Sequence, residues 1–323
     1  MKYPYLLVSD THFHAWQQFS TVDQHGVNSR LRIQLAELKR AVNALRDAGG
    51  SIVVHAGDCF HVRGQLAPTV LNPTLEAFRE IRRAGMDCIV LAGNHDLELR
   101  DTGVMSSAST ALSEYVRSVA TMDGHLLTDP GIVMLPWFPT TKQLLEAVDR
   151  LKSDVKGKDW PHAYDLIIHA PVNDVIPGLP DHGLDPAVLA GLGFKRVFAG
   201  HYHNHKELIK DKVYSIGAST HQSWSDIGSK AGFLLVYEDR VEWRCTHAPQ
   251  FVEIDANTDE ADILTIADGN YVRARVKVSK ESAISELRQF LLDNGALGVV
   301  VHAERDASAT SRVGAAASAG MSL

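Results

Sequence analysis

The feature that most constrains the fold is a set of short apolar runs that each stop at a polar residue. The clearest is Val90–Ala92, which is followed at once by Gly93-Asn94-His95-Asp96. An apolar run of this length is typical of a strand buried in an α/β sheet, and ligands of such sheets collect beyond the carboxyl ends of the strands. The pattern therefore predicts that Asn94 and His95 line a cleft. The tetrapeptide alone fits a simple polar turn equally well, because Gly, Asn and Asp all favour turns.

Apolar runs and amphipathic helices alternate along the first part of the chain. Strands are predicted at Tyr5–Ser9, Ser51–Ala56 and Cys88–Leu91. Between the first two, Ser29–Ala48 has leucine and valine at intervals of three and four residues, which predicts a helix packed on a sheet. A second helix is expected to begin at Asn72-Pro73. This alternation predicts an α/β fold with a largely parallel sheet covered by helices.

The rest of the chain continues this pattern and then changes. Further elements are predicted at Ser106–Val119 (helix), Ile132–Trp137 (strand), Thr140–Lys152 (helix), Asp165–Ile168 (strand) and Arg196–Ala199 (strand). From residue 207 to residue 247, strand-like segments are separated by short turns. We expect these segments to add antiparallel strands to a second sheet.

A domain boundary is expected near Pro249. Residues 1–249 would form the main domain, and residues 250–305 a small α+β module in which strand-like segments flank a helix at Lys280–Asp293. Residues 306–323 are mostly Ala, Ser and Gly, which is typical of a flexible tail.

Charge and cysteine content limit the classes of function. The formal net charge is −7 and the sequence pI is about 6.1, which argues against nucleic-acid binding through a broad basic surface. A nuclease that holds phosphate through metal ions remains open, because the rest of its surface can be acidic. The three cysteines have no paired spacing, no stretch is long enough to span a bilayer, and the amino terminus lacks the apolar core of a signal peptide. We therefore expect a cytoplasmic protein that does not insert into a membrane.

Five predicted strand ends carry side chains that can bind metal ions. In chain order they are Asp10 with His12, Asp58, Asn94 with His95, His169, and His201 with His203. In extended backbone, residues two apart point the same way, so Asp10 and His12 could grip one ion from a single strand end.

Without His95, these residues supply seven oxygen and nitrogen ligands, which is what two divalent ions sharing one bridging carboxylate require. A mixture of carboxylate, amide and imidazole without cysteine suits Mn²⁺, Zn²⁺ or Fe²⁺ better than Mg²⁺ or Ca²⁺, and Mn²⁺ is the first choice. Two such ions about 3.5–4 Å apart can hold a bridging hydroxide and stabilise an in-line displacement at phosphorus. Hydrolysis of a phosphoester is therefore the expected reaction.

These blocks resemble those of the calcineurin-like metallophosphoesterases, in the same order along the chain. The resemblance rests on Asp10-Thr11-His12, Gly57-Asp58-Cys59-Phe60-His61, Gly93-Asn94-His95-Asp96, His169 and Gly200-His201-Tyr202-His203. It implies a four-layer α/β/β/α sandwich of two packed sheets with a dinuclear metal site. It also implies a set of ligands: Asp10, His12 and His203 for the first ion, Asn94, His169 and His201 for the second, and Asp58 as the bridge.

The same resemblance implies that His95 contacts the phosphate and protonates the leaving oxygen, while Asp96 orients the ring of His95. For Asp96, a cap on the following segment is the alternative. His61 is expected either to bind the substrate phosphate or to be a hydrogen-bonded loop residue. Three tryptophans can stack on a base or simply pack, namely Trp16, Trp137 and Trp224.

Within the superfamily, the chain is most similar to the SbcD-type nuclease subunits of double-strand-break repair and to phage recombination endonucleases. The similarity lies in Arg63-Gly64 and in the segments Val213–Ser219, Trp224–Gly228 and Lys230–Phe233. It implies a Mn²⁺-dependent DNA exonuclease or endonuclease of repair, recombination or phage DNA processing, in the cytoplasm of a bacterium or of a phage-infected host. The module after Phe251 would then be a shortened capping domain.

This similarity also implies partners: single- or double-stranded DNA as substrate, an SbcC-type SMC-like ATPase, and a second copy in a homodimer. The short cap and the lack of a clear apolar helical pair for docking a coiled coil leave dependence on the ATPase open. The alternative function is a small-molecule phosphodiesterase, for example for cyclic nucleotides, with the same dinuclear site. The acidic charge favours this alternative and the cap-like module disfavours it. A non-enzymatic scaffold is a third possibility, which the complete ligand set disfavours.

Overall fold

The computed structural model describes residues 3–64, 66–99, 105–119, 124–128, 131–155, 159–278 and 282–305. The chain divides into two compact units. The large unit contains Met1–Gln222 and Ser229–Ala248, and the small unit contains Ser223–Gly228 and Pro249–Leu323. The boundary expected near Pro249 therefore misses one segment, because Ser223–Gly228 belongs to the small unit. The predicted tail, residues 306–323, lies outside the described residues.

The large unit holds two six-stranded sheets, of which the first has the order β12-β11-β1-β2-β3-β4. Its four parallel strands are β1 (Tyr5–Val8), β2 (Ile52–His55), β3 (Asp87–Leu91) and β4 (Arg117–Val119). The helices between them are α1 (Ser29–Asp47), α2 (Pro68–Arg83) and α3 (Ser107–Leu112). Two antiparallel strands complete the sheet beside β1, namely β11 (Gly232–Val236) and β12 (Val241–Cys245).

The second sheet has the order β5-β6-β7-β8-β10-β9. Its parallel strands are β6 (Gly131–Leu135), β7 (Asp165–His169), β8 (Arg196–Gly200) and β10 (Val213–Ser215). The edges are antiparallel strands, β5 (His125–Thr128) and β9 (Lys206–Ile209). Its helices are α4 (Thr141–Asp154) and α5 (Pro186–Gly191).

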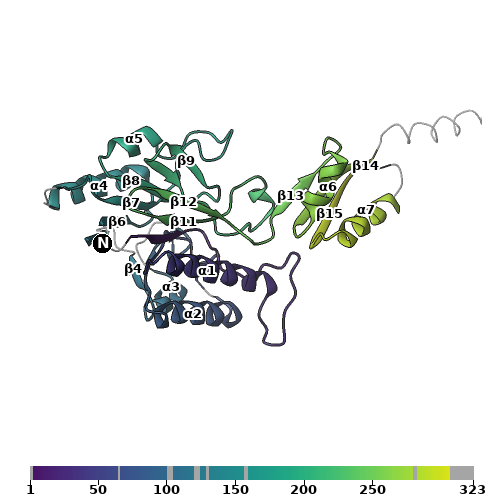
Figure 1. Cartoon of the computed structure of the whole chain (residues 1–323), viewed down its shortest axis with the longest axis horizontal. Coiled ribbons are helices and arrows are strands. Elements are labelled where there is room, and N and C mark those ends of the chain that lie inside the picture. The colour runs from purple at the N-terminus through teal and green to yellow at the C-terminus, as the bar shows by residue number, and fades with distance from the viewer. Residues whose placement is uncertain are drawn as a thin grey trace, which may run out of the picture. The chain divides into compact units, whose positions relative to one another are not determined.

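Alternate side chains of each buried strand enter two different cores. In β1, Leu6 and Val8 pack with α1 and α2, whereas Tyr5 and Leu7 belong to a cluster that contains residues of both sheets. A third cluster joins the second sheet to α4 and α5. Figure 1 accordingly shows α1 and α2 on one side of the paired sheets, and α4 and α5 on the other.

Helix α1 forms where its sequence predicts. The Asn28 side chain accepts hydrogen bonds from the main-chain N–H groups of Arg30 and Leu31, which caps the first turn. Leu31, Leu38 and Leu45 are buried along one face. The spacing of the apolar residues thus sets which face of α1 covers the first sheet.

Three predictions about individual elements are wrong. Helix α2 begins at Pro68 instead of Asn72-Pro73, because proline is well tolerated at the first helical position, where its missing N–H has no partner to lose. Ser106–Val119 is not one helix, since α3 ends at Leu112 and Arg117–Val119 pairs with β3 instead. The strands after residue 206 divide between the sheets: β9 and β10 join the second, and β11 and β12 join the first.

The small unit has three parallel strands, β13 (Phe251–Ile254), β14 (Tyr271–Val278) and β15 (Gly298–Arg305). They are connected by α6 (Glu260–Ala267), which the sequence prediction lacks, and by α7 (Ser282–Asp293). The short helix η1 (Trp224–Asp226) packs on β13, where the ring centroids of Trp224 and Phe251 are 4.8 Å apart. This contact explains why Ser223–Gly228 belongs to the small unit.

The longest helix in the described part of the chain, α1, has 19 residues. Neither it nor any other described helix combines the length and the apolar character that crossing a membrane requires.

A buried ion pair of the second sheet is joined to the first sheet by a tyrosine hydroxyl. Arg196 donates two hydrogen bonds to the carboxylate of Asp165, from Nε at 2.8 Å and from a terminal nitrogen at 2.7 Å. The hydroxyl of Tyr5 in the first sheet donates to the same carboxylate at 2.9 Å. Asp165 and Arg196 are 0% and 4% exposed, so their charges depend on each other for stabilisation.

Replacement of Asp165 by Ala is expected to lower the free energy of unfolding by about 3–5 kcal/mol, because Arg196 would keep a buried charge without a partner. Urea denaturation followed by circular dichroism measures this loss. Glu80→Ala is the matched control, since it breaks the exposed pair of Glu80 with Lys39 and should barely move the midpoint. Equal midpoints for both variants would contradict a stabilising role of the buried pair.

Candidate active site

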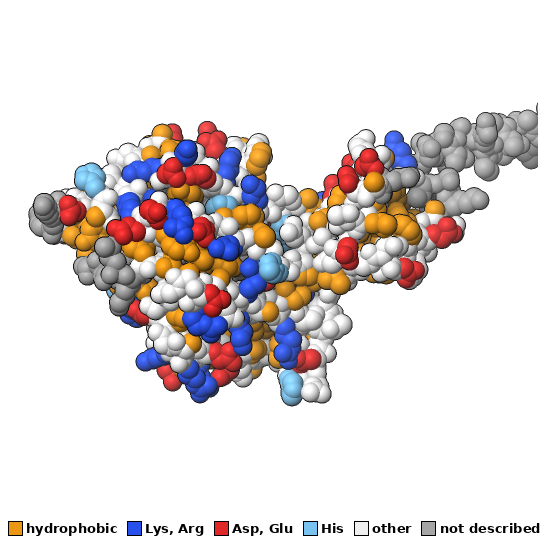
Figure 2. Space-filling model, in the orientation of Figure 1, with side chains coloured by type: hydrophobic (Ala, Val, Ile, Leu, Met, Phe, Trp, Pro, Cys, Tyr) orange, Lys and Arg blue, Asp and Glu red, His pale blue; other side chains and the backbone are white. Residues whose placement is uncertain are grey.

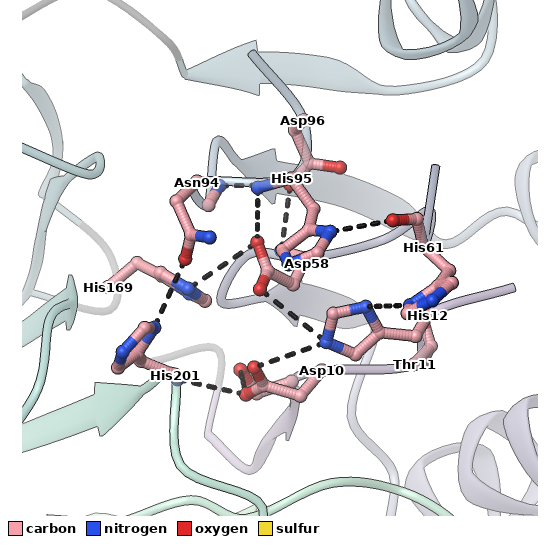
Figure 3. Close-up of polar contacts among 12 residues, drawn as sticks. Asp10, Thr11, His12, Asp58, His61, Asn94, His95, Asp96, His169 and His201 are labelled. Carbon is pink, nitrogen blue, oxygen red and sulfur yellow. Dashed lines mark hydrogen bonds and ion pairs between the residues drawn. The ribbon is translucent and has the colours of Figure 1, made fainter. Parts of the chain in front are cut away.

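The structure brings the predicted strand-end residues of both sheets together (Figure 3). Asp10 and His12 follow β1, Asp58 follows β2, Asn94 and His95 follow β3, His169 ends β7, and His201 and His203 follow β8. The contacts join the two sheets: Asp58 Oδ1 lies 3.5 Å from His169 Nε2, and Asn94 Oδ1 lies 3.1 Å from His201 Nδ1. Parallel strands that end at one edge thus place these side chains in one cluster.

Among the residues that the structure describes, potential metal ligands form three groups, and within each group the donor atoms lie within 4.8 Å of one another. These groups are Asp10, His12 and His203; Asp58, His169 and His201; and His12, His61 and His95. The first two contain six of the seven predicted metal ligands. Asn94 adjoins the second group through its contact with His201. The cluster could therefore hold metal ions at more than one position.

Asp58 lies between the first two groups. Its Oδ1 faces His169, and its Oδ2 lies 3.5 Å from His12 Nε2. Although burial opposes a charge here, the imidazoles of His169 and His12 outweigh it and hold the pKa of Asp58 well below its usual range. Burial likewise opposes a charge on His169, but the Asp58 carboxylate raises the pKa of His169 to about 9. Asp58 is therefore an anion with an imidazole on each side, and each imidazole is a potential metal ligand.

The buried oxygen of Asp10, the orientation of His169 and the donor elements also fit divalent ions. Asp10 Oδ1 is buried and has no hydrogen-bond partner among the described residues, and burial raises the pKa of Asp10. His169 Nδ1 lies 2.8 Å from the carbonyl oxygen of Ala56, the outer contact that orients a metal-binding imidazole. Since the donors are oxygen and nitrogen without sulfur, the chemistry suits Mn²⁺, Fe²⁺ or Zn²⁺.

Backbone strain is concentrated at these residues. Among the described residues, seven non-glycine positions have positive φ, and four of them are Asp10 (50°), His12 (43°), Asp58 (55°) and His201 (107°). Such conformations are costly for residues with a Cβ and gather at functional sites. They also correct the reason for pairing Asp10 with His12: the backbone there is left-handed and not extended, although His12 Nε2 still lies 4.0 Å from Asp10 Oδ1.

Two glycines leave room for the cluster. A Cβ on Gly57, which has φ +104°, would lie 2.2 Å from His169 Nδ1. A Cβ on Gly93 would lie 2.2 Å from Asp58 Oδ1. The glycine that precedes Asp58 and the one that precedes Asn94 are thus required by the close approach of other chain segments.

The hydrogen bonds of Asp96 differ from those expected of a residue that orients the ring of His95. Its carboxylate accepts hydrogen bonds from the main-chain N–H groups of Asp58 (2.7 Å), Gly93 (2.9 Å) and Cys59 (3.0 Å). The ring of His95 is held instead by the carbonyl oxygen of His61, 2.6 Å from Nδ1. Burial and the charge of Asp58 raise the pKa of Asp96 to about 7. Asp96 thus ties the loop after β2 to the loop after β3.

Asp96→Asn is expected to weaken Mn²⁺ binding roughly 10- to 100-fold, because its amide group would face the N–H groups that hold Asp58 in place. Titration of the purified protein with Mn²⁺, followed by calorimetry, measures the affinity. If the affinity stays unchanged while the pH profile of hydrolysis shifts, Asp96 acts through His95 as first predicted.

His61 lies in a row of neighbouring aromatic rings beside the cluster. Its ring stacks on that of His95, with centroids 5.6 Å apart at 17°, and its other neighbours are Trp16 at 4.5 Å and His14 at 5.1 Å. Burial and then the neighbouring His14 and His95 lower the pKa of His61 to about 4. At neutral pH His61 is therefore uncharged and can donate one hydrogen bond.

Several residues that support the cluster escaped the sequence reasoning. Ser9 donates to Asp10 Oδ2, Thr11 contacts His55 Nε2 at 2.8 Å, and Arg63 Nε donates to Asn94 O at 2.6 Å. For these, adjacency to a motif was a usable signal. Two glutamines had no such signal, since they come from distant parts of the chain: Gln34 Nε2 donates to Thr11 O, and Gln222 Nε2 donates to Asp10 O.

Comparison with known proteins gives one relative by sequence and two matches among solved structures. The exonuclease subunit 1 of enterobacteria phage T4 is 25% identical over 210 residues, which cover 63% of this chain and 58% of that protein. The chain thus spans little more than half the length of this relative. A dimetal phosphatase from Danio rerio has a TM-score of 0.43 at 15% identity, over 76% of this chain and 96% of that one. The protein TT1561 of Thermus thermophilus has a TM-score of 0.43 at 13% identity, over 75% and 98%.

The assignment of the chain to a family rests on a match over most of the large unit. Residues 3–205, which include β1 to β8 and every predicted metal ligand, match the calcineurin-like phosphoesterases. This match confirms the α/β metallophosphoesterase fold expected from the motifs. The chain therefore belongs to the calcineurin-like phosphoesterase family, whose members hydrolyse phosphoester bonds.

Proposed function

We propose that this protein is a Mn²⁺-dependent phosphodiesterase that cuts DNA, as an exonuclease or endonuclease of repair, recombination or phage DNA processing. The observation that carries the proposal is the position of Asp58, whose two carboxylate oxygens face two separate groups of ligands. Support for DNA as the substrate comes from the T4 relative, which is named an exonuclease subunit.

These groups support the ligand set that the family resemblance implies. Asp10, His12 and His203 would bind the first ion, Asn94, His169 and His201 the second, and Asp58 both. When bound, two Mn²⁺ ions polarise the phosphoryl oxygens and activate water as a nucleophile.

His95 supplies the proton for the leaving oxygen. Its Nδ1 donates to the carbonyl oxygen of His61, so Nε2 is the ring nitrogen left to face the substrate, and the ring must be an imidazolium for Nε2 to deliver a proton. The main-chain N–H of His95 donates to Asp58 Oδ1 at 2.8 Å, which fixes the position of the imidazole relative to the ligands. His61, uncharged at neutral pH, donates a hydrogen bond to the phosphate.

The acidic charge of the chain does not oppose a DNA substrate. On the face of the large unit shown in Figure 2, Lys and Arg side chains are interspersed with Asp and Glu. A nuclease that binds the scissile phosphate through metal ions needs no broad basic surface, although its affinity for long DNA is then modest. With DNA as substrate, the protein would act in the cytoplasm of a bacterium or a phage-infected host.

The proposal extends to the small unit and to partners. Residues 250–305 would act as a capping domain for the catalytic domain of residues 1–249. Because the T4 relative is named as one subunit of an exonuclease, we include a second protein, such as an SMC-like ATPase, as partner. We also propose a homodimer, which the resemblance to SbcD-type nucleases implies.

The substrate class can be tested by comparing kcat/KM for DNA with kcat/KM for a cyclic nucleotide. Protein supplied with Mn²⁺ and then desalted is expected to retain about two ions per chain. Its kcat/KM for DNA is expected to exceed that for a cyclic nucleotide. The reverse preference with the same metal content would favour the small-molecule alternative, and protein without metal or activity would favour a scaffold.

A further inference from the structure

A pocket of about 250 Å³ lies beside the candidate active site. Its walls come from the segment between β6 and α4, from α4 itself and from the residues after β7. They include Trp137, Phe138, Leu144 and Ala170, with polar groups at Thr141 and His182. None of these residues belongs to the predicted ligand set.

Trp137 connects the pocket to the site. Its ring centroid lies 5.2 Å from that of His201 and 6.2 Å from that of His169. Its main-chain N–H donates to the carbonyl oxygen of Ala92 at 2.8 Å, two residues before Asn94. The pocket wall therefore adjoins the three residues that we assign to the second ion, and a group bound there would be near the scissile phosphate.

The size and lining of the pocket indicate the kind of ligand. It is smaller than the pockets of about 300–1,000 Å³ that take drug-sized molecules, so it suits one flat ring system better than a whole nucleotide. Its wall is polar and apolar in nearly equal parts, and the polar side chains are Thr140, Thr141 and His182. The indole Nε1 of Trp137 is buried and has no hydrogen-bond partner among the described residues. A nucleobase offers an aromatic face for stacking, and acceptors that can pair with such a donor.

The other two tryptophans that the sequence left open have different neighbours. Trp16 has the guanidinium of Arg30 5.3 Å from its ring centroid and the ring of His61 at 4.5 Å. Trp224 packs on Phe251 in the small unit. Of the three, Trp137 lines the pocket described here.

We infer that this pocket takes a single base of the substrate, from a nucleotide joined to the scissile phosphate, with Trp137 as the stacking surface. The inference rests on the proposed DNA phosphodiesterase activity and names the part of the substrate that the site selects. A base in this pocket has left the duplex stack. Single strands and frayed ends are therefore better substrates than the interior of a duplex.

Abasic substrates test the inference. Single-stranded oligonucleotides carry one tetrahydrofuran residue on the 5′ or the 3′ side of the bond that is cut. With Mn²⁺, the parent protein is expected to lose roughly 10- to 100-fold in kcat/KM with one of these two substrates. Trp137→Ala is expected to lose as much on the intact strand and nothing further on that abasic strand. Trp137→Phe should retain most of the activity.

Three results would count against the inference. If Trp137→Ala slows the abasic strands as much as the intact strand, Trp137 only supports His201 and His169. If the parent protein cleaves intact and abasic strands equally well, no base is bound and the pocket assignment alone is wrong. A metal-loaded parent protein that leaves all DNA intact contradicts the proposed function itself, and the assignment falls with it.

Discussion

Asp58→Asn is expected to lower the rate of phosphodiester hydrolysis roughly a thousandfold or more, since transition-state charge stabilisation by metal ions amounts to several kcal/mol. Asp58 is buried between His12 and His169, each 3.5 Å from a different carboxylate oxygen. Asparagine keeps the shape but loses the negative charge that favours two cations in one small site. Steady-state rates on DNA, together with Mn²⁺ content by elemental analysis, measure both parts of the effect.

Asp239→Asn is the matched control, because it removes an exposed carboxylate that pairs with Arg240 far from the metal-ligand cluster in the sequence. This variant should bind Mn²⁺ and cut DNA as the parent protein does. An Asp58→Asn protein that is folded, carries the parent metal content and works within about tenfold of the parent rate would contradict the bridging position of Asp58.

His95→Gln has the second large expected effect, and that effect depends on the leaving group. A general acid contributes about 10²- to 10⁴-fold where the leaving oxygen needs a proton, as the alkoxide of DNA does. Nitrophenolate leaves without one, so hydrolysis of bis(p-nitrophenyl) phosphate should fall far less. Parallel measurement of kcat on both substrates reveals the difference.

His162→Gln is a suitable comparison for this experiment. His162 Nδ1 also contacts a main-chain carbonyl oxygen, that of Gly193, but the residue is exposed and outside the cluster. It should affect neither substrate. Equal losses on DNA and on the nitrophenyl ester in His95→Gln would mean that His95 positions the phosphate and does not deliver the proton.

Much of the large unit could be predicted because its signals are local. The run Tyr5–Val8 is apolar at every position, and a strand buried on both faces requires that pattern. The cap at Asn28 and the leucine spacing of α1 define that helix without tertiary information. The polar residues after β1, β2, β3, β7 and β8 could be grouped because parallel strands end at a common edge.

What could not be predicted depends on contacts between distant segments. Asp96 adjoins His95 in the sequence, yet its carboxylate accepts hydrogen bonds from the N–H groups of Asp58 and Cys59, which are close to it only in the folded chain. The left-handed backbone of Asp10 and His12 is imposed by main-chain hydrogen bonds to Gly57 and Asp58, where local preference favours extended chain. Pairing with β3 likewise makes Arg117–Val119 a strand.

The most direct test of the proposed function is digestion of end-labelled single- and double-stranded DNA in Mn²⁺, beside a chromogenic diester and a cyclic nucleotide. We expect labelled nucleotides or short fragments to appear with Mn²⁺, and EDTA or Asp58→Asn to abolish them. Metal-loaded protein that leaves every form of DNA intact while hydrolysing the chromogenic diester or the cyclic nucleotide would contradict the proposed function.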